Sequence, residues 1–386
     1  MGLPGASPGA RAPLTRTARV GVIGAGIAGL TLAWELARRG TGVVVVGSAR
    51  PRTSLVAAGM LAPMPESSVS SSILRFGVEA LRFYPEFLAA LAADCGRDVG
   101  FRRSGVLRLA ATDDDAAALR EEVGSYEAAG LPSQWLSPRA LRRLRPGLPD
   151  SLAGALLSFD EAQVQPEWLL AALREAAVSR GVEFVEGDVV ALAKRAAGVD
   201  IGFADGTLLG CDRVVLATGS WARELGGDAV PVRPVKGQLL VFREIAGPDH
   251  IVYAGHNYLL TKADGSVLLG ATMEEAGFSL AADGAAEALR EILPKTWPGL
   301  RGARAETRVG LRPAAPDQLP IIGALPENPA VYVFTGHYRN GFLLAPHQAR
   351  LASLEILDGR AQELFVPLRP RRFSAEVRRR PPRSRR

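Results

Sequence analysis

The sequence predicts an α/β fold that begins with a Rossmann-like, dinucleotide-binding β–α–β unit. Three observations predict it: an apolar run at 19–23 typical of a buried parallel strand, a Gly-x-Gly-x-x-Gly motif at 24–29, and an amphipathic helical pattern at 30–39. Another apolar run at 43–46 is expected to form the next strand. The 386 residues exceed what one simple core needs, so we expect two domains.

Each glycine of the motif has a separate physical task. Gly24 allows the tight turn after the strand, Gly26 lets the backbone approach a pyrophosphate, and Gly29 lets the helix pack closely on the strand. Ile27 and Ala28 lie in the same turn, where free N–H groups and the partial positive charge of a helix N-terminus favour phosphate. All five residues are therefore predicted to belong to a dinucleotide site.

The acid that normally ends the second strand of this unit, and binds the ribose hydroxyls, is missing. Gly47 occupies that position, Ser48 follows, and Arg50 and Arg52 come next. The arginines suit the 2′-phosphate of NADP, whereas FAD bound without the carboxylate is the alternative. The motif alone leaves both cofactors open. In the FAD case we expect Gly47 to weaken cofactor retention, because the hydroxyls lose a charged hydrogen-bond partner.

The net charge of +6 is concentrated at the C-terminus. Nine arginines and one acid, Glu376, lie between Arg369 and Arg386, so this stretch carries +8 and the rest of the chain −2. No aromatic residue is interleaved with the arginines after Phe373, which argues against a nucleic-acid partner. We expect residues 367–386 to form a solvated basic tail.

The two cysteines, Cys95 and Cys211, lie far apart and outside any Cys-x-x-Cys or Cys/His cluster, so we expect no disulfide framework and no metal site. Reduced thiols fit a cytoplasmic protein. Residues 1–17 lack the apolar core of a secretion signal and are expected to be a disordered leader. No run approaches the roughly 20 apolar residues that a membrane helix needs, so we expect no membrane partner.

Three further blocks carry a family resemblance: 54–63 (SLVAAGMLAP), 310–313 (GLRP) and 335–346 (TGHYRNGFLLAP). They closely resemble the glycine oxidase family of thiamine biosynthesis, within the larger D-amino-acid oxidase and sarcosine oxidase group of flavoproteins. The resemblance runs from about Arg19 to Phe373 and implies FAD over NADP. It also implies that FAD is held non-covalently, because the cysteine that tethers it in sarcosine oxidases has no counterpart after the 310–313 block.

The resemblance implies a discontinuous organisation. A GR2-type FAD-binding domain is expected from residues 18–85, 150–228 and 309–366. A substrate-binding domain of α+β type, built on an antiparallel sheet, is expected from residues 86–149 and 229–308.

The family's substrate site maps onto six residues of this chain. An amino acid in an apolar site needs a cation for its carboxylate, and a guanidinium can meet both oxygens. Arg312 in the 310–313 block matches the arginine that does this in the family. Tyr258 matches a tyrosine that donates a hydrogen bond to the same carboxylate. The resemblance further implies that the pocket is lined by Arg339, His256, Met60 and Met273.

The implied cofactor contacts extend beyond the glycine motif. Residues 336–341 are expected to form a loop before a helix, with backbone N–H groups facing the flavin edge where negative charge gathers on reduction. Ala58 and Gly59 are expected to allow close approach of the flavin. The full set implied by the resemblance adds Ser48, Ala58, Gly59, Met60, Val189, Thr218, Gly219, Gly336, His337, Tyr338, Arg339, Asn340 and Gly341.

The resemblance implies oxidative deamination of glycine, or a similar small amino acid, to its imine or 2-oxo acid, with O₂ reduced to hydrogen peroxide. No side-chain acid–base pair is expected, since the cofactor supplies the chemistry. A homo-oligomer is expected, a tetramer being common in similar enzymes. Three alternatives remain: an amine oxidase of a natural-product pathway, a D-amino-acid dehydrogenase that uses a quinone, and a flavin-free binding protein.

Overall fold

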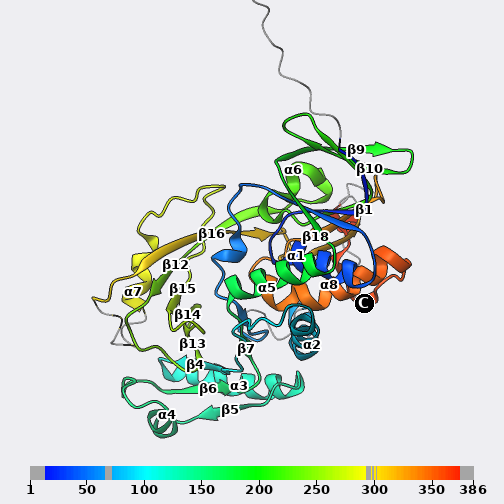
Figure 1. Cartoon of the computed structure of the whole chain (residues 1–386). Coiled ribbons are helices and arrows are strands. Elements are labelled where there is room, and N and C mark those ends of the chain that lie inside the picture. The colour runs from blue at the N-terminus through cyan, green and yellow to red at the C-terminus, as the bar shows by residue number, and fades with distance from the viewer. Residues whose placement is uncertain (1–13, 66–71, 293–296, 298–299, 301, 374–386) are drawn as a thin grey trace, which may run out of the picture.

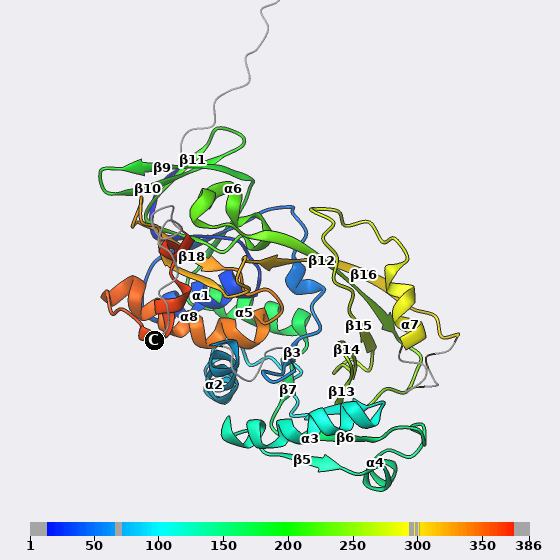
Figure 2. The same ribbon diagram turned by 180° about the vertical axis from the view of Figure 1, so that it is seen from behind.

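The structure, a computed structural model, describes residues 14–65, 72–292, 297, 300 and 302–373. Within these residues the chain builds two large sheets of eight strands each and a small two-stranded one. The two large sheets form neighbouring parts of the molecule, as the opposite views in Figure 1 and Figure 2 show. The expected α/β fold is confirmed.

The first sheet carries the glycine motif. β1 (Leu14–Ile23) pairs in parallel with β2 (Val43–Gly47) and β11 (Leu208–Leu216), and β2 pairs in parallel with β8 (Glu183–Glu186). The run Val43–Gly47 is buried along its whole length, as expected for a parallel strand covered on both faces. In spatial order the strands are β17 (Ile321–Ala324), β18 (Val331–Thr335), β11 (Leu208–Leu216), β1 (Leu14–Ile23), β2 (Val43–Gly47) and β8 (Glu183–Glu186). Off this path, β10 (Gly198–Phe203) pairs antiparallel with β11, and β9 (Val189–Arg195) pairs antiparallel with β10.

Helices cover the first sheet. Figure 1 shows α1, α5 and α8 side by side against it, with α2 packed on α8 and α6 near the β9–β10 hairpin. The hydroxyl of Tyr84 in α2 donates a hydrogen bond to the carbonyl oxygen of Phe342 at 2.6 Å and so holds the first turn of α8. The bounds are α1 (Ile27–Arg38), α2 (Ser72–Cys95), α5 (Pro166–Ser179), α6 (Ala222–Gly226) and α8 (Gly341–Asp358).

The second sheet is antiparallel except for one parallel pair, β13 with β4. In spatial order its strands are β16 (Glu306–Ala314), β12 (Arg233–Phe242), β15 (Val267–Gly270), β14 (Asn257–Thr261), β13 (Ile251–Ala254), β4 (Val106–Ala110), β6 (Gly154–Ser158) and β5 (Ser133–Leu136). The remaining elements are α3 (Asp113–Ala128), α4 (Pro138–Leu144), α7 (Leu289–Ile292), β3 (Met60–Leu61), β7 (Ala162–Gln163) and the 3₁₀ turns η1 (Thr53–Leu55), η2 (Gly219–Trp221), η3 (Gly227–Ala229), η4 (Ala285–Ala288), η6 (Glu363–Leu368) and η7 (Pro370–Phe373).

Strand pairing differs from the expected domain boundaries in three places. β6 pairs with β4 and β5, so residues 154–158 belong to the second sheet although 150–228 was expected in the FAD-binding domain. β16 pairs along its length with β12, so 309–314 belong there too. α2 runs unbroken through the expected boundary at 85/86. Sheet membership follows backbone hydrogen bonds, which the sequence blocks do not reveal.

Both expected terminal segments are partly structured. Strand β1 begins at Leu14, so residues 14–17 of the expected disordered leader are part of a strand. Residues 1–13 of that leader lie outside the described residues. In the expected tail, Leu368 is buried, Arg369 forms an ion pair with Glu355, and Arg372 forms one with Asp317 at 2.7 Å. The prediction of a solvated tail is therefore wrong for residues 367–373, because Arg369 and Arg372 have acidic partners on α8 and before β17. Residues 374–386 lie outside the described residues. In the described part of the chain, no helix is long and apolar enough to span a bilayer.

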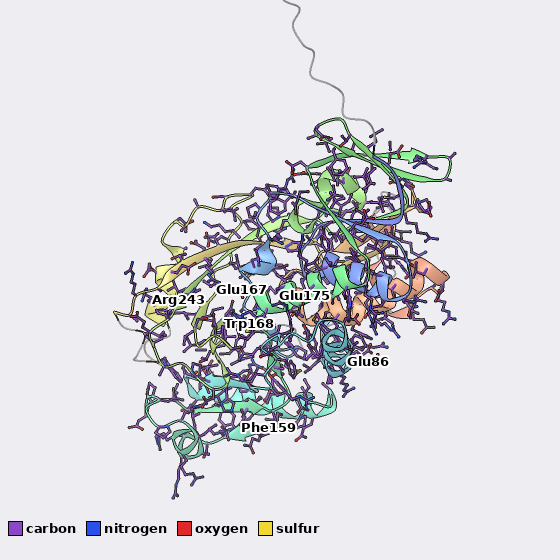
Figure 3. All side chains as sticks on the ribbon, in the orientation of Figure 1. Glu86, Phe159, Glu167, Trp168, Glu175 and Arg243 are labelled. Atoms are coloured by element: carbon purple, nitrogen blue, oxygen red, sulfur yellow. The ribbon has the colours of Figure 1, made fainter. Side chains whose placement is uncertain are left out.

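Polar contacts join the two sheets at their boundary. Figure 3 labels Glu167 and Trp168, which lie at the start of α5. The Glu167 carboxylate accepts a hydrogen bond from Arg308 of β16 at 3.0 Å. This ion pair links β16 to α5 and is partly exposed to solvent.

Candidate cofactor and active site

The first cavity lies at the carboxyl ends of β1, β2 and β11, where open α/β sheets bind ligands. Its volume is about 230 Å³. The turn between β1 and α1 forms one wall, the ends of β2 and β8 another, and the loop before α8 a third. The dinucleotide site predicted from the glycine motif is thus a real cavity.

Two of the three glycines of the motif, Gly24 and Gly29, leave no room for a side chain. A Cβ on Gly24, whose φ is +116°, would lie 2.3 Å from the carbonyl oxygen of Ala217. A Cβ on Gly29 would lie 1.9 Å from the carbonyl oxygen of Gly24, so Gly29 packs the helix on the turn and does not line the cavity. The N–H of Ile27, at the start of α1, donates to the hydroxyl of Ser54 at 3.1 Å.

Most of the predicted cofactor residues surround this cavity. The lining includes Gly24, Gly26, Ile27, Ala28, Ser48, Val189, Thr218, Gly219, His337, Tyr338, Arg339 and Gly341. Ala58, Gly59, Met60 and Asn340 instead line a second cavity that adjoins the first, and Gly29 and Gly336 line neither. The cysteines Cys95 and Cys211 are absent from both linings.

The loop before α8 presents backbone to both cavities. Tyr338 has a φ of +51°, and its N–H donates to the carbonyl oxygen of Pro313 at 3.1 Å, which ties the loop to the end of β16. His337 is buried against Phe334, with ring centroids 5.0 Å apart. Burial lowers the pKa of His337 to about 4, so its imidazole is neutral near pH 7.

Several lining residues were not predicted from the sequence. Trp221 follows β11, and the Arg50 guanidinium lies 5.6 Å from its ring centroid while pairing with Glu224 at 2.7 Å. Glu186, at the end of β8, and Asp188, in the turn after it, also line the cavity. Their only sequence signal was their position at a strand end of the sheet, which required the order of the strands to be known.

The second cavity has a volume of about 120 Å³ and lies between the first cavity and the second sheet. The two share the residues Thr53, Ala57, Tyr338, Arg339 and Phe342. All six predicted substrate residues, namely Arg312, Tyr258, Arg339, His256, Met60 and Met273, line it. No Asp or Glu is among its described lining residues. A ligand here would therefore lie directly beside a ligand in the first cavity.

Arg312 projects from β16 across the neighbouring strand β12. Its guanidinium lies over Gly237, where a Cβ would meet three guanidinium atoms at 2.1–2.4 Å. Its Nη1 donates to the carbonyl oxygens of Thr272 at 3.0 Å and Lys236 at 3.5 Å. Among the described residues, its Nε and Nη2 make no hydrogen bond and no carboxylate pairs with it. A half-buried cation without an acidic partner is suited to an anionic ligand.

Tyr258 lies opposite Gly270, its register partner on β15. A Cβ on Gly270 would lie 2.5 Å from the tyrosine hydroxyl oxygen, so this glycine makes the space that the ring occupies. Gly237 and Gly270 were not predicted to be site residues. Glycine in the interior of a strand, which usually weakens a sheet, was the signal that could have found them.

A network of polar side chains supports the backbone to which the Arg312 guanidinium donates its hydrogen bonds. Lys236 donates to Asp283 at 2.6 Å and pairs with Glu274 at 3.1 Å. The Thr272 hydroxyl accepts from the N–H of Gln238 at 2.8 Å. The hydrogen bond to Asp283 is the main cause that raises the pKa of Lys236, and the pKa of Asp283 is correspondingly lowered. The network holds the Lys236 and Thr272 carbonyls that receive the guanidinium.

The two methionines differ in position. Met60 lies inside, where its sulfur accepts from the hydroxyl of Tyr253 at 3.4 Å. Met273 has 61% of its surface exposed, and its sulfur accepts from the Tyr338 hydroxyl at 2.9 Å. Met273 and Tyr338 therefore mark the mouth of the second cavity, where the two cavities meet.

Leu311, the residue before Arg312, is held from the first sheet's side. The Thr53 hydroxyl donates to the Leu311 carbonyl oxygen at 2.6 Å and accepts from its N–H at 3.3 Å. The Ser220 hydroxyl donates to the same carbonyl oxygen at 2.8 Å. Thr53 lines both cavities and Ser220 the first, so these bonds fix the guanidinium relative to the dinucleotide cavity.

Lys262 is a buried cationic residue that the sequence did not single out. Its Nζ donates to the carbonyl oxygens of Ala58, at 2.6 Å, and Val164. It therefore holds the backbone of the 54–63 block where that block lines the second cavity. Burial lowers the pKa of Lys262 to about 7. A neutral amine still has the two N–H groups that these carbonyls need.

Lys262 is expected to make stability depend on pH in a definite window. Between pH 7 and about 10.5 the unfolded chain binds a proton that the folded chain does not, so the free energy of unfolding rises with pH. Urea unfolding of wild type and Lys262→Met at pH 7 and pH 9.5 measures this. The variant should be less stable at both pH values, by a wider margin at pH 9.5; equal margins would contradict the lowered pKa.

Together, the fold and the site define a class of protein: a dinucleotide-dependent enzyme whose cofactor cavity adjoins a small cavity for an anion. The first cavity fits FAD, because Gly24 and Gly26 line it without side chains and the N-terminus of α1 lies at the cavity. Among the described residues, no cluster of three or more His, Cys, Asp or Glu could hold a metal ion.

Comparison with known proteins places the chain within this class. A family model described as "FAD dependent oxidoreductase" (DAO) matches residues 19–353. The chain belongs to this DAO family of FAD-dependent oxidoreductases. This confirms the resemblance to the D-amino-acid oxidase group and makes FAD the cofactor, so the NADP alternative is wrong.

One curated protein and two solved structures illustrate what the chain is similar to. The "Bifunctional protein ThiO/ThiG" of Trichormus variabilis is 32% identical over 92% of this chain and 55% of its own length. The chain thus spans about half the length of that relative. The crystal structure of glycine oxidase from Geobacillus kaustophilus matches with a TM-score of 0.86 and 29% identity, over 92% of this chain and 98% of that one. Iminodiacetate oxidase from Chelativorans sp. matches with a TM-score of 0.81 and 28% identity, over 91% and 99%.

Proposed function

We propose that the protein oxidises glycine, or a similarly small amino acid, at its Cα–N bond with bound FAD as the electron acceptor. The product is the imine, which water converts to the 2-oxo acid and ammonia. O₂ reoxidises the cofactor and leaves as hydrogen peroxide. The division into a FAD-binding and a substrate-binding unit belongs to the same proposal, with β6 and β16 assigned to the substrate-binding unit.

One observation carries the proposal. The Arg312 guanidinium lies half-buried in the wall of the second cavity without an acidic partner among the described residues, and that cavity shares a wall with the cofactor cavity. A carboxylate that reached Arg312 would place the rest of a small ligand toward the shared wall. The volume of about 120 Å³ favours a small substrate.

The chain's own residues bind and orient the substrate. Arg312 offers Nη2 and Nε to the carboxylate, and Tyr258 supports the same end of the ligand from β14. Met60 and Phe342 supply apolar contacts that keep water from the reacting carbon. With no Asp or Glu in the described lining, no carboxylate stabilises the ammonium form of the substrate, so the amine gives up its proton to water on binding and its lone pair then assists departure of the Cα hydride.

A second candidate substrate is a secondary amine with two carboxylates. Arg339 lines the same cavity as Arg312, so two arginine residues lie within one site. The similarity to iminodiacetate oxidase supports this candidate as well. A diacid would be discriminated from glycine by its dependence on Arg339.

The decisive experiment is anaerobic bleaching of the bound flavin by a panel of amines: glycine, sarcosine, D-alanine, L-alanine and iminodiacetate. We expect glycine to bleach the cofactor fastest and L-alanine to leave it oxidised. On readmission of air, colour should return with one hydrogen peroxide formed per flavin.

Other results of this panel would favour the alternatives. Bleaching that is reversed by a quinone but not by air indicates a dehydrogenase. Fastest bleaching by iminodiacetate indicates the diacid amine, and fastest bleaching by another amine indicates a natural-product oxidase. Failure of every amine to bleach a yellow preparation removes the proposed function. A preparation that stays colourless after incubation with FAD indicates a binding protein.

We propose thiamine biosynthesis as the biological setting of this activity. The likeness to a ThiO/ThiG protein supports a role in thiamine biosynthesis, and a cytoplasmic, homo-oligomeric enzyme is consistent with that role. Sedimentation of the purified holoenzyme tests the oligomeric state. Thiamine auxotrophy after deletion of the gene tests the pathway.

A further inference from the structure

The ribose end of the cofactor cavity lacks the usual acid on β2, since Gly47 stands at that strand end. We propose that Glu186, at the end of the neighbouring strand β8, binds the ribose hydroxyls of FAD in its place. This assignment depends on FAD binding alone, so it holds whatever the amine substrate is.

The pairing of the two strands brings Glu186 to the required position. β2 and β8 are parallel, and Gly47 is the register partner of Glu186. The N–H of Gly187 donates to the carbonyl oxygen of Gly47 at 2.8 Å, so the strand ends are fastened together. Register partners in a sheet project their side chains to the same face. Glu186 therefore extends on the side where a residue at 47 would have extended.

The carboxylate fills the space that Gly47 leaves. A Cβ built on Gly47 would lie 3.1 Å from both Oε1 and Oε2 of Glu186. Both residues line the cofactor cavity next to Ser48. A glutamate at 47 and a glutamate at 186 would crowd each other and repel, so the glycine and the acid form a matched pair. In this chain the acid therefore lies at the end of β8, and the end of β2 carries a glycine.

The other acids of the cavity are less suited to this task. Glu224 is paired with Arg50 at 2.7 Å. Asp188 lies beyond the end of β8, separated from Glu186 by Gly187. Within the described residues, the Glu186 carboxylate takes part in no hydrogen bond or ion pair. Both of its oxygens are available to accept from the adjacent 2′- and 3′-hydroxyls of a ribose.

Two consequences follow for cofactor binding. FAD retention is not weakened by Gly47, contrary to the expectation from the sequence, because the charged hydrogen bonds are restored from β8. A 2′-phosphate would meet the Glu186 carboxylate at close range, so like-charge repulsion rejects phosphorylated dinucleotides despite Arg50 and Arg52.

The test measures FAD affinity of apo-protein by quenching of flavin fluorescence, without any turnover. Glu186→Gln should weaken FAD binding about 10- to 100-fold, as expected for loss of hydrogen bonds to a charged group. Asp188→Asn, the matched loss of charge on the same cavity rim, should bind FAD within about threefold of wild type. Gly47→Glu alone should weaken binding, whereas Gly47→Glu with Glu186→Ala should restore it.

A cofactor analogue makes the test independent of folding defects. Wild type should bind FAD built on 2′,3′-dideoxyadenosine about as weakly as Glu186→Gln binds FAD, and Glu186→Gln should not distinguish the two. Equal affinity of wild type for FAD and the dideoxy analogue would overturn the assignment. So would unchanged affinity in Glu186→Gln, or a larger loss in Asp188→Asn.

Discussion

Replacement of Arg312 by methionine is expected to lower kcat/KM for glycine by about 100- to 1,000-fold, mainly through KM. The reason is the loss of a charged pair with the substrate carboxylate in a half-buried site, a change that typically costs several kcal/mol. The flavin spectrum and the FAD affinity should stay as in wild type, because Arg312 does not line the cofactor cavity. Steady-state kinetics and a flavin titration measure both quantities.

Arg308→Met is the matched control for this prediction. Arg308 lies four residues earlier on the same strand, pairs with Glu167, and lines neither cavity. Its loss should leave KM for glycine near the wild-type value. Arg312→Lys should fall between the two, since a lysine keeps the charge but not the two-pronged geometry. An unchanged KM in Arg312→Met would remove this residue from substrate binding.

Gly237→Ala is expected to reduce kcat/KM by about 100-fold, although it replaces none of the side chains that bind the substrate. The added methyl would lie 2.1–2.4 Å from guanidinium atoms of Arg312 and displace them by about 1 Å, a shift that can cost this much in rate. FAD content should be retained, because Gly237 lies outside the cofactor cavity. Kinetics with glycine, together with the flavin absorbance per chain, provide the measurement.

The control for Gly237 is another glycine in a strand, Gly202 of β10. A Cβ there would have its nearest neighbours at 3.6 Å, which is an ordinary contact. Gly202→Ala should therefore keep wild-type kinetics. If both alanine variants behaved alike, loss of strand glycine would be the cause and the displacement of Arg312 would not.

The sequence predicted the parts of the site whose residues are close together in the chain. The β1–α1–β2 unit follows from local periodicity and the glycine motif, and the structure has it within a few residues of the expected bounds. Resemblance supplied Arg312 and Tyr258, which do line one cavity although they are far apart in the sequence.

What the sequence missed depends on contacts between distant strands. Glu186 gains meaning only when β8 is known to lie beside β2, and Gly237 only when β16 is known to lie beside β12. For the same reason, the sequence did not predict that β6 and β16 belong to the second sheet. Lys262 was overlooked because an isolated lysine carries no local pattern, while its burial against two carbonyls depends on the tertiary fold.

The anchoring of Leu311 by Thr53 and Ser220 has a thermodynamic consequence. These hydroxyls face the cofactor cavity, yet they hold the peptide next to the guanidinium that receives the carboxylate. A cofactor that restrains these two residues also restrains the wall of the second cavity, and such coupling between two ligands is reciprocal. We therefore expect a carboxylate bound at Arg312 to raise the affinity for FAD by the same factor by which bound FAD raises the affinity for the carboxylate.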